Sequence, residues 1–159
     1  MIDSNRSMKL HLIFKVSLLL TVSNMLLGCS STPEPPPPLE LNVSVNIQAN
    51  NGELFYVVAK TTNEKGFMLD SYENIANLAF SDNPAPDRLI VFSVVPGSNQ
   101  DYTIVQPAEG MIGLYFLLTK PGSQWKKLLT IPFESNYDVL LDATGKIVIR
   151  KSKHWYSFF

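Results

Sequence analysis

Few residues in this sequence could carry out chemistry, and their number limits the kinds of site that the chain can form. The chain of 159 residues has one cysteine, Cys29, and two histidines, His11 and His154. A single cysteine excludes an internal disulfide and a cysteine-rich zinc site. The sequence has no motif of the Gly-x-Ser-x-Gly, Walker or His-Glu-x-x-His kind. We therefore assign no enzyme activity, no metal site and no cofactor.

Carboxylates are the remaining candidates for chemistry, because a glycosidase pair needs only spatial proximity. They fall at predicted strand ends or loops, where acidic residues are common: Asp87, Asp101, Glu109 and Asp138. A deep polar pocket that gathered them would indicate an enzyme or a small-ligand binder. A filled core would argue against that class of protein.

Cys29 follows a segment that has the features of an export signal. Basic residues precede a mostly apolar run over residues 16–27, which is too short to be a convincing membrane span. The exit, Leu26-Leu27-Gly28-Cys29, resembles the lipobox of bacterial lipoproteins, in which the thiol is joined to a diacylglycerol and the chain is cut just before it. We predict a signal peptide over residues 1–28 and acylation of Cys29, with chains such as palmitate anchoring the protein in a membrane.

The residues after Cys29 indicate a destination and a spacer. Ser30 and Ser31 stand where an aspartate tends to retain Gram-negative lipoproteins in the inner membrane. By resemblance, this predicts an outer-membrane anchor with the protein facing the periplasm. Residues 29–38 then form a lipidated, proline-rich tether, since five of the eleven prolines lie between Ser30 and Pro38. Such a run favours a stiff polyproline II spacer, although a site for a proline-recognising module is the alternative.

The charge of the chain excludes a typical nucleic-acid binder. The whole sequence has 13 Lys+Arg and 14 Asp+Glu, so it lacks a basic surplus. Without the predicted signal peptide, which holds Asp3 and three basic residues, 13 acidic and 10 basic residues remain, a net charge of −3. The folded part, residues 39–159, has the length of one domain.

A period of two runs through most of this domain and predicts an all-β, antiparallel β-sandwich of about seven or eight strands. The first strand places Leu41, Val43, Val45 and Ile47 toward the core, and Asn50-Asn51-Gly52 predicts a hairpin to the second strand. Apolar residues three and four apart predict one short helix over Leu69–Phe80, capped by Asp70 or Ser71. The predicted strands are 41–48, 54–61, 89–95, 102–105, 111–119, 125–131, 137–141 and 146–150.

Several of these elements resemble a known family, the type VI secretion system outer-membrane lipoproteins (TssJ family), of which the chain would be a divergent member. The resemblance rests on Val94-Val95-Pro96-Gly97 followed by Tyr102-Thr103-Ile104, and on the Gly113 strand that precedes Trp125-Lys126-Lys127. Phe67 and a helix through Tyr72 and Leu78 stand where the family has a phenylalanine and a helical insertion. The resemblance implies a transthyretin-like β-sandwich.

The resemblance also implies a partner and a binding loop. The family binds the periplasmic part of a large inner-membrane protein, TssM, together with other subunits of the secretion core, through the loop between its first two strands. Here that loop is Ala49, Asn50, Asn51, Gly52 and Glu53. The loop is short and lacks the family's Asn-Pro element, so the alternative contact is Lys120, Pro121, Gly122 and Ser123. A pilotin-like assembly lipoprotein of another envelope complex is the alternative function.

Overall fold

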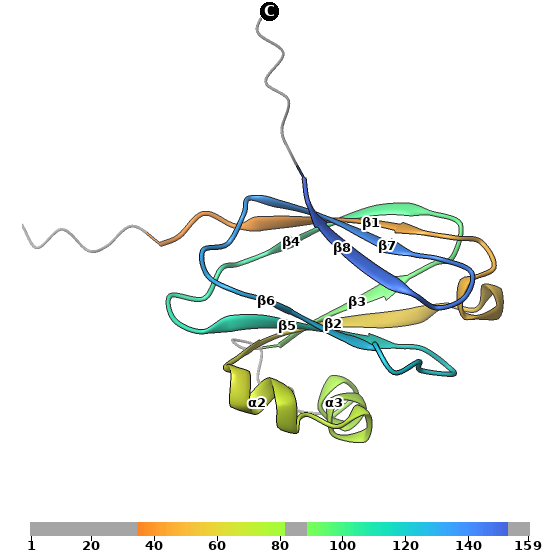
Figure 1. The fold of residues 1–159 in the computed structure, drawn as a ribbon, viewed down its shortest axis with the longest axis horizontal. Coiled ribbons are helices and arrows are strands. Elements are labelled where there is room, and N and C mark those ends of the chain that lie inside the picture. Colours follow the sequence, from red (N-terminus) through yellow and green to blue (C-terminus); the bar gives the residue numbers. More distant parts are fainter. Residues whose placement is uncertain (1–34, 82–88, 153–159) are drawn as a thin grey trace, which may run out of the picture. The chain divides into compact units, whose positions relative to one another are not determined.

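In the computed structural model, which describes residues 35–81 and 89–152, the chain folds into two stacked sheets with a helical layer on one side (Figure 1). The sheets have the strand orders β4-β1-β7-β8 and β3-β2-β5-β6. The strands are β1 Leu39–Val45, β2 Phe55–Thr62, β3 Leu89–Val94, β4 Asn99–Ile104, β5 Met111–Leu117, β6 Lys126–Leu129, β7 Asn136–Leu141 and β8 Ile147–Lys151. The predicted sandwich and strand number are thus confirmed.

The core lies between the two sheets and is entirely apolar among the described residues. Alternation works as predicted in β1, where Leu41, Val43 and Val45 are buried. β5 is buried on both faces because one face meets the other sheet and the second meets the helices. Among the described residues, those of the core all lie between Leu39 and Ile149, within the compact unit Pro35–Phe159, which therefore has a substantial core of its own.

The predicted hairpin between the first two strands is wrong, because β1 and β2 belong to different sheets. Their connection holds a short 3-10 helix, η1 Ala49–Gly52, with left-handed backbone at Asn50 and Asn51, in place of a two-residue hairpin turn. β1 instead pairs antiparallel with β4 and parallel with β7. The sandwich is therefore mixed in one sheet, where the sequence predicted only antiparallel pairs.

Ile47 does not reach the core, contrary to the alternating pattern. β1 ends at Val45, and the Asn46 N–H then donates to the Leu141 carbonyl while Gln48 N–H donates to Asn46 Oδ1. This turn ends the alternation, since faces alternate only while the backbone stays extended. Ile47 is consequently 70% exposed.

The predicted helix over Leu69–Phe80 is confirmed as α3 Tyr72–Ala79. A second helix that the sequence did not predict, α2 Glu64–Leu69, precedes it, and both cover the outer face of the β3-β2-β5-β6 sheet (Figure 1). Asp70 separates them in an extended conformation. Ser71 caps α3 by accepting from the Asn74 N–H, as one of the two predicted caps. Ile75 is fully buried against the sheet, whereas Leu69, predicted on the packed side, is exposed.

Some predicted features fall outside the described residues, among them Cys29, Asp87 and His154. The predicted signal peptide and residues 29–34 of the predicted tether also fall outside the described residues. Across residues 35–81 and 89–152, none of the helices has the length and apolar character needed to cross a membrane.

Candidate partner-binding surface

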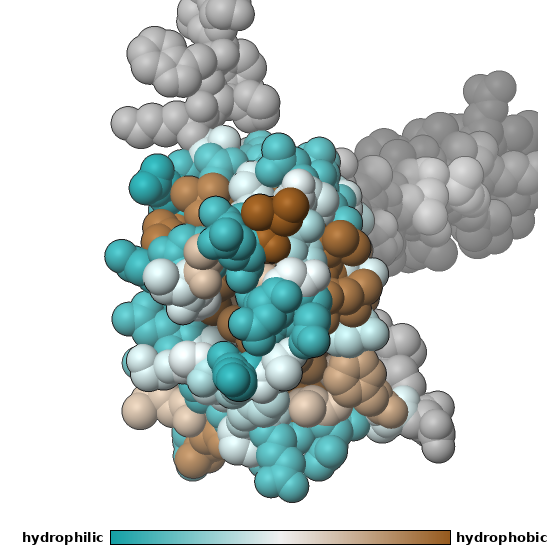
Figure 2. Space-filling view, turned by 90° about the vertical axis from the view of Figure 1, so that its right-hand side faces the viewer, coloured by the Kyte–Doolittle hydropathy of each residue, from teal (hydrophilic) through white to brown (hydrophobic). Residues whose placement is uncertain are grey.

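Several connections between strands meet at one end of the sandwich, which we call the tip surface. It consists of the β1–β2 loop (residues 46–54), the turn over 95–98 and the start of the β5–β6 loop (119–122). The Gly97 N–H donates to the Val45 carbonyl at 3.0 Å, and Thr119 N–H donates to Asn50 Oδ1 at 2.8 Å. Figure 2 looks at this end of the molecule, where hydrophobic and hydrophilic side chains are interspersed.

Asn50 holds the β1–β2 loop in shape. Three successive residues, Asn50, Asn51 and Gly52, have φ values of 50°, 58° and 75°, a conformation that asparagine and glycine tolerate best. The Asn50 amide donates to the carbonyls of Glu53 and Leu54 at 3.0 and 3.4 Å while it accepts from Thr119. The loop is therefore pre-organised, and binding through it would require little ordering.

The two loops that the sequence offered as alternatives form one surface. Besides the bond from its backbone to Asn50, Thr119 donates through Oγ1 to Glu53 Oε2 at 3.1 Å. Lys120, Pro121 and Gly122 follow directly and are exposed. The predicted contact residues Asn50, Asn51, Gly52 and Glu53 thus lie next to Pro121 and Gly122.

Sequence reasoning missed the apolar part of the tip surface. Ile47 lies over Gly97, where an added Cβ would come within 3.1 Å of its side chain. Leu54 and Val95 flank the first register pair of β2 and β3, and both side chains are about half exposed. Exposed apolar side chains with a polar rim are typical of protein-binding surfaces. The signal in the sequence was the turn chemistry after Val45, which removes Ile47 from the strand.

A polar cluster beneath α2 fixes the helical layer to the sheet. The Lys60 ammonium contacts both carboxylate oxygens of Asp70, at 2.7 and 2.9 Å, and the Tyr115 hydroxyl donates to the same carboxylate. Burial, together with the Asp70 carboxylate, raises the pKa of Tyr115 well above its usual range. The cluster is part-buried and its groups bond to one another, so it serves structure.

The Trp-Lys pair of the predicted resemblance has a structural role in the same layer. Lys126 Nζ donates to the carbonyls of Phe67 and Asp70 at 2.6 and 2.8 Å, at the C-terminal end of α2. Trp125 packs edge-on against Tyr72. Gly113 is required because Tyr115 crosses above it, with the hydroxyl 2.5 Å from where a Cβ would stand.

The three candidate carboxylates that the structure describes do not converge on a pocket. Asp101 and Asp138 lie on the open face of the β4-β1-β7-β8 sheet, on either side of Asn42, which donates to Asp138. Glu109 lines a hollow of about 1000 Å³ at the end opposite the tip surface, with Lys60 on its wall. Among the described residues no group of His, Cys, Asp or Glu could hold a metal ion.

The sandwich with its tip surface defines a class of β-sandwich protein suited to binding another protein. The sequence matches the family described as IglE, N-terminal domain, over residues 56–141, and the chain belongs to that family. No curated protein gives a significant match.

Solved structures of type VI secretion proteins share the fold. Lip of Serratia marcescens, a membrane-bound component of that system, has a TM-score of 0.57 and 13% identity, covering 74% of this chain and 99% of its own. A chain of a type VI membrane complex has a TM-score of 0.57 and 14% identity, covering 71% of this chain and 97% of its own. The lipoprotein TssJ1 of Pseudomonas aeruginosa has a TM-score of 0.53 and 12% identity, covering 75% of this chain and 100% of its own. The resemblance to a divergent TssJ-type sandwich is thus confirmed at the level of the fold.

Proposed function

We propose that this protein is an outer-membrane lipoprotein of a type VI secretion membrane complex. In this role, acylated Cys29 anchors it, residues 30–38 form the spacer, and the sandwich faces the periplasm. Its partner is the periplasmic part of a TssM-type inner-membrane protein. Support comes from the lipobox-like sequence before Cys29, the IglE family match and the shared fold of the secretion lipoproteins.

The pre-organised tip surface is the observation that carries the binding role. Asn50 fixes the loop, Thr119 joins it to the neighbouring loop, and Ile47, Leu54 and Val95 supply exposed apolar area. A rigid loop with an apolar centre binds without the ordering cost of a flexible one. The role is structural, and it uses no catalytic group.

A matched pair of variants tests this binding role. Ile47 is 70% exposed on the tip surface, and Val105 is 72% exposed beyond the end of β4, at the other end of the sandwich. Ile47→Glu should abolish capture of the cognate TssM-type periplasmic domain, whereas Val105→Glu should retain it. Equal capture by both variants, or no capture by the wild type, would count against the proposal.

The anchor is tested separately with Cys29→Ser. Acyl chains contribute about 0.8 kcal/mol per buried methylene group, so their loss should move the protein out of the membrane fraction. Metabolic labelling with a palmitate analogue should mark the wild type alone. Labelling of Cys29→Ser would show that the acyl chain is attached elsewhere.

A further inference from the structure

One edge of the sandwich is open and the other is closed. On the closed edge, the Tyr102 hydroxyl of β4 donates to the Ser93 carbonyl of β3 at 2.7 Å, and its ring packs on Phe92. On the open edge, β8 of one sheet and β6 of the other border a groove of about 500 Å³. Apolar side chains form part of its lining, including Leu129, Tyr137, Ile147 and Ile149.

The outer side of β8 offers a row of backbone groups for pairing. The Asp142 N–H donates to Lys146, and the Ser152 N–H donates to Asn136, so the even-numbered residues of β8 face β7. In an antiparallel pair, residues whose backbone groups bond to the neighbouring strand alternate with residues whose backbone groups point away from it. The N–H and C=O groups of Ile147, Ile149 and Lys151 therefore point outward, and the described part of the chain provides no partner for them.

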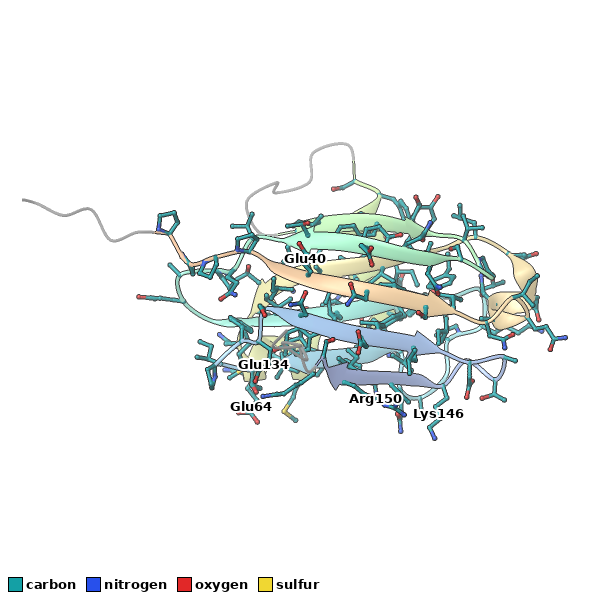
Figure 3. All side chains as sticks on the ribbon, turned by 90° about the horizontal axis from the view of Figure 1, so that it is seen from above. Glu40, Glu64, Glu134, Lys146 and Arg150 are labelled. Atoms are coloured by element: carbon teal, nitrogen blue, oxygen red, sulfur yellow. The ribbon has the colours of Figure 1, made fainter. Side chains whose placement is uncertain are left out.

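The side chains along this edge are apolar or basic. Lys146, just before β8, and Arg150 in β8 extend beyond the sheet, as Figure 3 shows. Lys127 and Lys151 line the groove. This basic edge stands out because the chain without its predicted signal peptide has a net charge of −3.

The acidic groups near the edge already have partners. Glu134 pairs with Lys151 at 2.8 Å, and Asp142 accepts three hydrogen bonds within its own turn. Asp138 lies one strand further in, opposite Arg150, and accepts from Asn42. A strand added at β8 would therefore meet only basic and apolar side chains directly.

We propose that β8 is a docking edge for an extended strand of a partner protein, in which acidic and apolar residues alternate. Its backbone pairs with Ile147, Ile149 and Lys151, its acidic side chains approach Lys146 and Arg150, and its apolar side chains enter the groove toward β6. Strand addition at a sheet edge gains affinity from backbone pairing and specificity from alternate side chains. A second copy of this chain fits poorly, because two basic β8 edges would repel each other.

The inference is tested with a fluorescein-labelled peptide of about seven residues that alternates Glu and Val, and with the unit Pro35–Phe159 as the receptor. Fluorescence polarisation should show binding of this peptide and none of its Lys-Val counterpart. Added salt should weaken the binding, since the charged contacts are exposed. Amide resonances of Ile147, Ile149 and Lys151 should shift most on titration.

Variants separate backbone pairing from charge. Lys151→Pro removes an outward N–H without touching the bonds to β7, and it should abolish binding. Arg150→Glu should weaken binding roughly tenfold, whereas Lys65→Glu, an equal charge change on α2, should have no effect. If Lys151→Pro fails to fold, Arg150→Glu against Lys65→Glu decides alone.

Other outcomes would overturn the inference. Equal binding of the Glu-Val and Lys-Val peptides, or no binding of either, excludes the acidic strand. Self-association that Lys151→Pro removes would assign the edge to a second copy. Ile47→Glu should leave peptide binding unchanged, so failure of the tip contact and failure of the β8 edge are distinguishable.

Discussion

Asn50 combines two functions at the tip surface, a left-handed backbone and an amide that reaches three backbone groups. Asn51 has a similar left-handed backbone, with φ of 58° compared with 50° for Asn50. Of the two, only Asn50 accepts the hydrogen bond from the Thr119 N–H. The two residues therefore separate the effect of the backbone from that of the hydrogen bonds.

We expect Asn50→Gly to lower the free energy of unfolding by about 1 kcal/mol, because glycine keeps the left-handed backbone but loses the amide. Asn51→Gly should leave stability nearly unchanged. Urea denaturation of both variants measures the difference. Equal stability losses would mean that the Asn50 side-chain bonds contribute nothing.

The Tyr115 hydroxyl makes stability depend on alkaline pH. Burial and the Asp70 carboxylate raise its pKa in the folded protein above the ordinary value of 10.0. The unfolded chain therefore loses this proton first as the pH rises. Stability linked to Tyr115 is complete below pH 10 and decreases above it, by up to about 1.4 kcal/mol per pH unit.

Tyr115→Phe should accordingly flatten the decline of unfolding free energy between pH 9 and pH 11 (an interval of about two units around the unfolded value). Burial also raises the pKa values of Tyr72 and Tyr102, so part of the slope should persist. Chemical denaturation across this interval measures the effect. An unchanged slope in Tyr115→Phe would contradict the assigned environment.

At the scale of elements, Lys126 adds a second polar attachment of the helical layer beside the Lys60–Asp70–Tyr115 cluster. Lys126 binds the carbonyls at the end of α2, while its neighbour Lys127 bonds to Gln124 and faces the open edge. Lys126→Met should therefore speed amide hydrogen exchange in α2, and Lys127→Met should not. If both variants left exchange unchanged, the Lys126 bonds would contribute nothing to the stability of α2.

Strands could be predicted from the sequence where the pattern of apolar residues alone determines which faces are buried. Alternation located the buried side of β1, and the apolar run over β5 indicated a strand covered on both faces. The three- and four-residue spacing also located α3, which begins after Ser71, one of the two predicted caps. The short helix α2 was missed, because none of its six residues is buried and the segment therefore has no apolar periodicity.

At the scale of the whole molecule, residues 35–38, the described end of the predicted tether, and the tip surface lie at opposite ends of β1. The chain enters β1 at Leu39 and reaches the β1–β2 loop after Val45 (Figure 1). We propose that this arrangement presents the tip surface away from the anchoring membrane. A partner that spans the periplasm would approach from that side.

The candidate site could be predicted in part from the sequence. Both loops were named in advance, but their union through Thr119 required the fold, because residues 50 and 119 are far apart in the chain. The apolar residues Ile47 and Val95 were missed, since exposure depends on where a strand ends. Cys29, in contrast, was identified by its local sequence alone, and its acylation remains a prediction.

The central claim is tested most directly by photo-crosslinking in cells. A photoreactive amino acid replaces Ile47 in the chain with its predicted signal peptide, and the same replacement at Val105 serves as the control for exposure. We predict a crosslink from position 47 to a large TssM-type inner-membrane protein and none from position 105. Crosslinks to that protein from position 105 alone, or from neither position, would contradict the account.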